Sequence, residues 1–172
     1  IGTPLFTRVD EMQPGDIVVL EMSSFQLMNM TVSPHIAVVT NDTPNHLDYH
    51  THLEEYIQAK KSIFKYQNED DILILNYDNA VTKGFADEAK GKVIFFSDQE
   101  RLDNGYIVDD GTIKCCENKL RKHILNTRDV ALIGKHNYQN ICAALAATET
   151  LVDEETAKRV VTRFTGVHLR LD

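Results

Sequence analysis

The sequence predicts a single α/β domain in three layers, with a mostly parallel sheet flanked by helices and an added β-hairpin region. Three observations predict this fold. Short apolar, β-branched runs recur along the 172 residues, helix-like segments separate them, and an Asp-Gly pair lies between two alternating stretches. Buried strands that alternate with helices are typical of parallel sheets. An Asp-Gly pair between alternating stretches is a strong signal for a tight hairpin turn.

The apolar runs give the predicted strands. Residues 17–20 follow a Pro-Gly-Asp turn and residues 36–39 follow a proline. Both runs are continuously apolar, which favours strands that are buried on two faces. We expect them to be neighbouring parallel strands whose carboxyl ends share a crevice. Further strands are expected at 72–76 and 93–97, in a hairpin over 105–115, and in a strand that ends at 131–133.

Helices are predicted between and after these strands. Residues 52–67 carry apolar side chains near helical spacing, with acidic residues in the early turns. A second helical segment is expected around 80–89, and an Ala-rich helix over about 138–150. Asp153 is expected to cap a last helix from 154 to about 164, with Gly166 as its stop signal. Because no repeat or Pro/Gly/Ser linker interrupts this series, we expect one domain over residues 1–172.

Composition excludes several classes of protein. With 26 acidic and 18 basic residues, the net charge of −8 argues against a bulk nucleic-acid or anionic-membrane surface. No run approaches the roughly 20 apolar residues that span a bilayer. The three cysteines include no C-x-x-C spacing, which favours neither a disulfide framework nor a zinc cage. These features predict a soluble, cytoplasmic protein with no nucleic-acid or membrane partner.

A polar stretch over residues 40–50 offers amide, hydroxyl, carboxylate and imidazole groups within a short loop. His46 and His50 flank Asp48 and superficially resemble a metal-binding pair, although Pro44 before them argues that His46 lies in the loop. From these residues alone, a solvated loop and a metal or phosphate site are equally good interpretations. A metal-dependent hydrolase using His46, Asp48 and His50 is therefore one alternative function.

Other candidate residues have a functional and a structural interpretation. Glu21 follows a predicted strand and could bind Mg²⁺, or it could merely close the strand while Ser23 or Ser24 caps a helix. Lys60 could be functional or an ordinary solvated lysine. Asn137 and Asn140 open the Ala-rich helix, where they could bind an anion, contact a base or only cap the helix. The G-x-x-x-x-G-K-[ST] phosphate loop does not occur in these residues.

Taken together, these elements resemble the Mur ligase family of ATP-dependent amide-forming enzymes, and in particular its central ATPase domain. Seven ordered motifs carry the resemblance: Ile1-Gly2-Thr3-Pro4, Glu21-Met22-Ser23-Ser24-Phe25-Gln26-Leu27, Thr40-Asn41-x-x-Pro44-Asn45-His46-Leu47-Asp48, Tyr56-x-x-Ala59-Lys60, Asn76-Tyr77-Asp78, Gly134-x-His136-Asn137-x-x-Asn140 and Phe164-Thr165-Gly166. The paired serines followed by Phe25 look most like the members that add D-glutamate.

The resemblance implies a reaction of peptidoglycan synthesis. ATP would phosphorylate the carboxylate of UDP-N-acetylmuramoyl-L-alanine, and the amine of D-glutamate would attack the acyl phosphate. ATP and Mg²⁺ are the implied cofactors, and the cation would stabilise phosphoryl oxygens electrostatically. Another Mur or folylpolyglutamate-type ligase is the alternative within the same class.

The resemblance also assigns roles to individual residues. It implies that Glu21 and His46 bind magnesium, and that Lys60 is carbamylated and contributes to the metal region. Asn137 and Asn140 match the family's adenine-side asparagines, and Arg170 its nucleotide-contacting arginine. The substrate and metal region would include Ser23 and Asn41. Two departures are Asn45, where the family usually has Asp, and His168, one position earlier than the family's histidine.

The opening residues lack an initiator Met and look like the interior of a longer protein. From the resemblance we expect a central domain that is truncated at both ends. Alone, it is expected to bind nucleotide weakly and to form no amide. The complete protein is expected to be a monomer, whereas the fragment could self-associate through an unpaired sheet edge.

Overall fold

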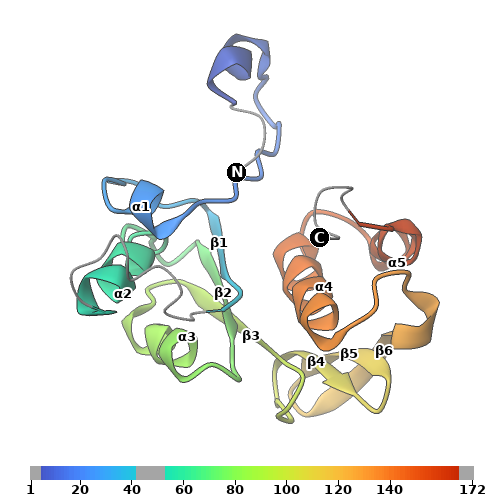
Figure 1. Cartoon of the computed structure of the whole chain (residues 1–172). Coiled ribbons are helices and arrows are strands. Elements are labelled where there is room, and N and C mark those ends of the chain that lie inside the picture. Colours follow the sequence, from blue (N-terminus) through green and yellow to red (C-terminus); the bar gives the residue numbers. More distant parts are fainter. Residues whose placement is uncertain (1–4, 42–52, 167–172) are drawn as a thin grey trace.

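The structure, a computed structural model, describes residues 5–41 and 53–166 and contains a six-stranded sheet (Figure 1). The strand order follows the chain from β1 to β6. Neighbouring strands are parallel from β1 to β4 and antiparallel from β4 to β6. The predicted mostly parallel α/β fold is therefore confirmed. The strands are β1 (Ile36–Val39), β2 (Ile72–Asn76), β3 (Lys92–Ser97), β4 (Gly105–Asp109), β5 (Thr112–Glu117) and β6 (Leu120–Asn126).

Helices connect β1 to β2 and β2 to β3, and two longer helices follow the antiparallel strands. The α2 helix (Leu53–Lys61) joins β1 to β2, and α3 (Ala80–Gly84) with the 3-10 helix η2 (Phe85–Glu88) joins β2 to β3. The chain then forms α4 (Lys135–Thr148) and α5 (Glu154–Arg163). Asp153 accepts a hydrogen bond from the Thr156 backbone N–H at 2.8 Å, which confirms the predicted cap of α5. The remaining helical elements are η1 (Phe6–Glu11), α1 (Ser24–Leu27) and η3 (Thr127–Asp129).

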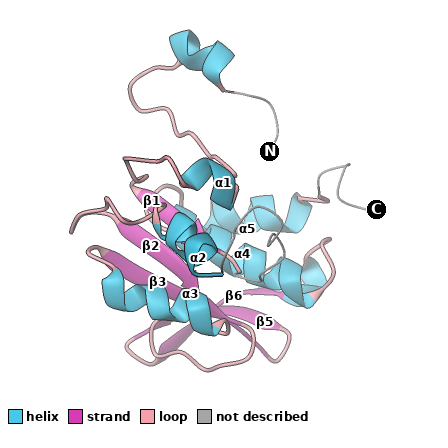
Figure 2. Ribbon diagram, turned by 60° about the vertical axis from the view of Figure 1, so that its left-hand side comes forward, coloured by secondary structure: helices cyan, strands magenta, loops and turns pink. Residues whose placement is uncertain are grey.

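Side chains that alternate along the strands build the three layers. Leu73 and Leu75 of β2 pack on one face with Phe64, which follows α2, and with Phe85 of η2. Ile74, between the two leucines, packs on the other face against buried residues of α4. Because both faces carry apolar side chains, the central strands are continuously apolar. Figure 2 shows the sheet with α2 and α3 in front of it and α4 and α5 behind it.

The antiparallel half begins with the predicted hairpin. Strands β4 and β5 pair from Asp109 opposite Thr112 to Gly105 opposite Cys116. Asp110 and Gly111 between them have φ angles of 47° and 68°. Positive φ at both central residues is characteristic of a type I′ turn, which matches the twist of the paired strands. The Asp-Gly pair therefore predicted this hairpin turn correctly.

Two predicted strands are not present. Residues 17–20 form no strand, and their exposed fractions run from 45% for Val18 to 87% for Val19. They lie in an extended segment apart from the sheet, whose first strand is β1. Residues 131–133 form no strand either, because β6 already ends at Asn126 and η3 turns the chain. An apolar run becomes a strand only where a neighbouring strand accepts its backbone hydrogen bonds.

Candidate functional site

The candidate site lies at the carboxyl ends of the parallel strands. In such sheets, ligands bind outside these ends, where loops gather polar groups. The buried Asn76 at the end of β2 donates from Nδ2 to the Thr40 carbonyl at 2.9 Å. Asn79 donates from Nδ2 to the Asn41 side-chain oxygen, also at 2.9 Å. The segments that leave β1 and β2 are therefore tied together by two amide side chains.

Lys60 of α2 reaches the same place. Its Nζ donates to the Asn41 carbonyl at 3.1 Å and lies 4.6 Å from the centroid of the Tyr56 ring. Lys60 is half-buried, and a cation over an aromatic ring is stabilised by the ring quadrupole. Its neighbour Lys61 has a different partner, donating to Glu88 Oε1 at 2.6 Å. The two lysines are therefore not an equivalent solvated pair, and Lys60 and Asn41 are brought together as one group.

Ser23 has a structural role in the short helix α1. Its hydroxyl accepts a hydrogen bond from the Gln26 backbone N–H at 3.3 Å, and the Gln26 side chain accepts from the Ser23 backbone N–H at 2.9 Å. This reciprocal arrangement is a capping box. The cap interpretation of Ser23 is thus confirmed, while Glu21 just before it is exposed. Helix α1 also contacts α2, the helix that carries Lys60.

The start of α4 carries the two predicted nucleotide-side asparagines. The helix begins at Lys135 after Gly134, whose φ of 117° suits glycine best. Asn137 donates from Nδ2 to the Ile133 carbonyl at 2.9 Å, and Asn140 is exposed. Residues three apart lie on one face of a helix. Asn137 and Asn140 therefore share one face at the N-terminal end of α4.

The sequence did not single out several polar residues near the carboxyl ends of the parallel strands. Asn79, Asp98 and Gln139 were not singled out, yet Asp98 and Asn79 follow strand ends just as Asn41 does. Their position just after a parallel strand is the sequence signal that could have identified Asp98 and Asn79. Gln139 sits on α4 and donates from Nε2 to Asp98 Oδ1 at 2.7 Å. Such a contact between a helix and a strand end has no local sequence signature.

Some predicted site residues lie outside the described part of the chain. These are His46 and Arg170, together with Asp48, His50, Asn45 and His168. Over residues 5–41 and 53–166, no three His, Cys, Asp or Glu side chains gather as a potential metal site. Over the same ranges, no helix has the length and apolar character needed to cross a membrane.

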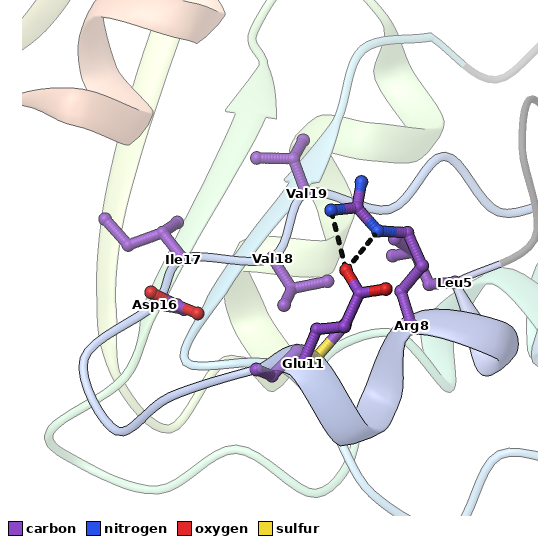
Figure 3. A pocket seen from close by; sticks show the side chains of 8 residues that line it. Leu5, Arg8, Glu11, Asp16, Ile17, Val18 and Val19 are labelled. Carbon is purple, nitrogen blue, oxygen red and sulfur yellow. Dashed lines mark hydrogen bonds and ion pairs between the residues drawn. The ribbon is translucent and has the colours of Figure 1, made fainter.

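A separate cavity of about 290 Å³ lies in the N-terminal segment (Figure 3). Its wall includes Val18, Val19 and the ion pair in which Arg8 Nε donates to Glu11 Oε2 at 2.9 Å. The residues that line it come from positions 5–19 and include none of the predicted site residues. This cavity is therefore distinct from the strand-end site.

Solved structures share the fold. MurF from Acinetobacter baumannii superposes with a TM-score of 0.63 at 20% identity, covering 81% of this chain and 31% of that one. UDP-N-acetylmuramate:L-alanyl-gamma-D-glutamyl-meso-diaminopimelate ligase from Neisseria meningitides superposes with a TM-score of 0.60 at 20% identity, covering 78% of this chain and 41% of that one. At this level of identity, the likeness establishes the fold alone.

Curated relatives match the whole chain. UDP-N-acetylmuramoylalanine--D-glutamate ligases from Acetivibrio thermocellus and Clostridium kluyveri are each 45% identical over 172 residues. Each match covers 100% of this chain and 37% of the relative. The family described as the Mur ligase middle domain matches residues 1–148. With its motifs, its fold and these matches in agreement, the chain belongs to the Mur ligase family.

Proposed function

We propose that the chain is the central, ATP-binding part of a ligase that adds D-glutamate to UDP-N-acetylmuramoyl-L-alanine during peptidoglycan synthesis. The observation that carries this proposal is the 45% identity, over every residue of the chain, to proteins named as D-glutamate ligases. The chain spans 37% of their length, so the complete reaction belongs to the protein that contains it. A cytoplasmic location and a monomeric complete protein are parts of the same proposal.

The reaction has two parts in this proposal. ATP phosphorylates the carboxylate of the UDP-linked substrate, and the amine of D-glutamate then displaces phosphate from the acyl phosphate to form the amide. Positioning and electrostatic stabilisation of phosphoryl oxygens are the main tasks of a protein in phosphoryl transfer. Groups held at strand ends by buried amides such as Asn76 are suited to both tasks, because they need little reorganisation when the substrates bind.

The nucleotide side is assigned to α4. Asn137 and Asn140 share the helix face near the strand ends, and we propose that they contact the adenine side of ATP. An amide offers both a donor and an acceptor, as recognition of a base edge requires. Arg170, outside the described residues, is assigned to the nucleotide from the family resemblance.

The metal side is assigned to Glu21, Lys60 and the loop that follows Asn41. Mg²⁺ prefers oxygen ligands and retains water while it bridges to phosphates. The exposed Glu21 carboxylate is a ligand of this kind, and Lys60 would supply oxygens only after carbamylation, which converts its cation to an anion. The half-buried position of Lys60 beside Tyr56 and Asn41 fits a lysine held in place for such a modification. His46 completes the proposed set, with Ser23 and Asn41 on the substrate side.

The test uses the complete protein that contains this chain. Amide formation is measured with UDP-N-acetylmuramoyl-L-alanine, Mg-ATP and, in parallel, D-glutamate, L-lysine, diaminopimelate or L-glutamate. We expect product and ADP only with D-glutamate. Preference for another amino acid would contradict the assigned substrate, and hydrolysis that needs no nucleotide would contradict the ligase reaction. Lys60→Arg, which keeps the charge but prevents carbamylation, should reduce kcat, whereas Lys61→Arg should not.

A further inference from the structure

Three polar side chains from three elements converge beside the start of α4. Asp78 follows β2, Asp98 follows β3, and Gln139 lies on α4. Gln139 Nε2 donates to Asp98 Oδ1 at 2.7 Å and to Asp78 Oδ2 at 3.3 Å. The Asp98 backbone N–H donates to Asp78 Oδ2 at 2.9 Å, and the Ser97 hydroxyl donates to Asp78 Oδ1 at 2.5 Å. The Gln139 amide is thus held by two carboxyl groups that are themselves fixed.

The electrostatics of this network favour a neutral donor at position 139. Burial raises the pKa of the Asp98 carboxyl, and its hydrogen bond with Asp78 raises that pKa further, whereas Gln139 and the charge of Lys135 lower it. A carboxylate at position 139 would face two others and lose the donated hydrogen bonds. Opposed carboxyl groups repel unless a donor lies between them. The amide N–H groups of Gln139 supply that donor.

Gln139 also occupies a particular position along α4. Tyr138 and the buried residues from Ile141 onward pack against the face of the sheet. Gln139 instead binds the strand ends, and it lies between Asn137 and Asn140 in the sequence. Because a helix turns about 100° per residue, fixing one side chain of its first turns also fixes the direction of its neighbours. Apolar packing holds α4 against the sheet, and this polar contact ties its first turns to the strand ends.

We propose that Gln139, held by Asp78 and Asp98, is a positioning residue that sets the placement of Asn137 and Asn140 for binding ATP. This inference rests on the proposed nucleotide role of the two asparagines. It adds a residue to which neither the family resemblance nor the comparisons give a role. The same bonds connect α4 to the strand ends at which Asn79, the neighbour of Asp78, binds Asn41.

The test compares three variants of the complete protein. Gln139→Glu replaces the donor by an acceptor and should raise the Kd and KM for Mg-ATP about tenfold, the effect of losing one charge-assisted hydrogen bond, with a smaller change in kcat. Gln139→Glu with Asp98→Asn restores one donor and one acceptor and should recover most of the affinity. The matched control is Gln99→Glu, which adds the same charge at an exposed residue beside Asp98 and should change neither constant.

Hydrogen exchange separates this inference from the proposed function. In Gln139→Glu, the backbone amides of residues 137–141 should exchange faster than in the unaltered protein, and in the double variant they should recover. Unchanged exchange, or faster exchange with an unchanged Kd while Asn140→Ala weakens ATP binding, would overturn the positioning role. If Asn140→Ala itself leaves the Kd unchanged, the nucleotide assignment fails and the inference falls with it. If Gln139→Glu does not fold, Gln139→Met removes the donor without adding charge. It should likewise weaken Mg-ATP binding and speed exchange at residues 137–141, and the same contrary results would overturn the inference.

Discussion

Residues 17–20 and strand β2 have nearly the same apolar sequence, Ile-Val-Val-Leu in one and Ile-Leu-Ile-Leu in the other. Both follow a turn in which an aspartate accepts a backbone hydrogen bond from three residues earlier, Asp16 from Gln13 and Asp71 from Asn68. Yet Leu75 is fully buried within the sheet, whereas Leu20 is 61% exposed. The difference is in the neighbours, because β2 lies between β1 and β3. Local sequence sets the tendency to form a strand, and pairing decides it.

The largest expected effect is the loss of stability when a leucine of the buried segment is truncated. Leu75→Ala should lower the free energy of unfolding by about 2–5 kcal/mol, because it leaves a cavity among packed side chains. Leu20→Ala, the same substitution at an exposed site, should change it by less than about 0.5 kcal/mol. Urea unfolding of the 172-residue chain, followed by circular dichroism, measures both. Equal losses would mean that residues 17–20 are also packed in a core.

The residues that end the two segments give a second contrast. Asn76→Ala removes the donor to the Thr40 carbonyl and the acceptor for the Asp78 N–H, which should cost about 1–3 kcal/mol because buried partners lose their hydrogen bonds. Glu21→Ala, at the exposed end of the other segment, should cost far less. The same urea titration checks this prediction, and a neutral Asn76→Ala would contradict the strand-end network.

A charge introduced into residues 17–20 should reduce self-association of the chain and leave its stability nearly unchanged. Exposed apolar segments and open sheet edges are sites of self-association, and a lysine opposes it. Val19→Lys should therefore reduce any concentration-dependent association of the 172-residue chain in sedimentation velocity. Lys158→Arg, a conservative change on α5, serves as the control. If the chain associates equally strongly with Val19→Lys, the copies contact one another through another surface.

The smallest expected effect is the pH dependence of stability that comes from Asp71, in the turn before β2. The hydrogen bond from the Asn68 backbone, and then that from His35, hold the pKa of Asp71 below its ordinary value. A carboxyl whose pKa is lowered by folding stabilises the protein above its unfolded pKa, near 4, and loses this contribution as the pH falls further. The stability advantage of the unaltered chain over Asp71→Asn should thus be present at pH 7 and shrink below about pH 4. An advantage that grows on acidification would reverse the assigned sign.

The same contrast shows how far sequence patterns reach. Periodicity and turn chemistry located β1 to β3, the β4–β5 hairpin and the helices α2 to α5, because those signals are local, but they did not delimit β6, η1 or η3. They placed strands wrongly at 17–20 and 131–133, where the fold provides no partner strand. In the site, Lys60 and Asn41 were both singled out, but only the fold shows their 3.1 Å contact. Gln139 escaped notice because its partners follow two different strands.

In the proposed function, the strand ends and the start of α4 form one nucleotide site. Hydrogen exchange of the complete protein, measured with and without Mg-ATP, tests this assignment. We expect slower exchange at residues 40–41, 76–79, 97–98 and 137–141 when the nucleotide is bound. Residues 66–70, which precede β2 and lie at the opposite ends of the strands, should show no change. Protection at 66–70 or around the N-terminal cavity, with none at the start of α4, would contradict it.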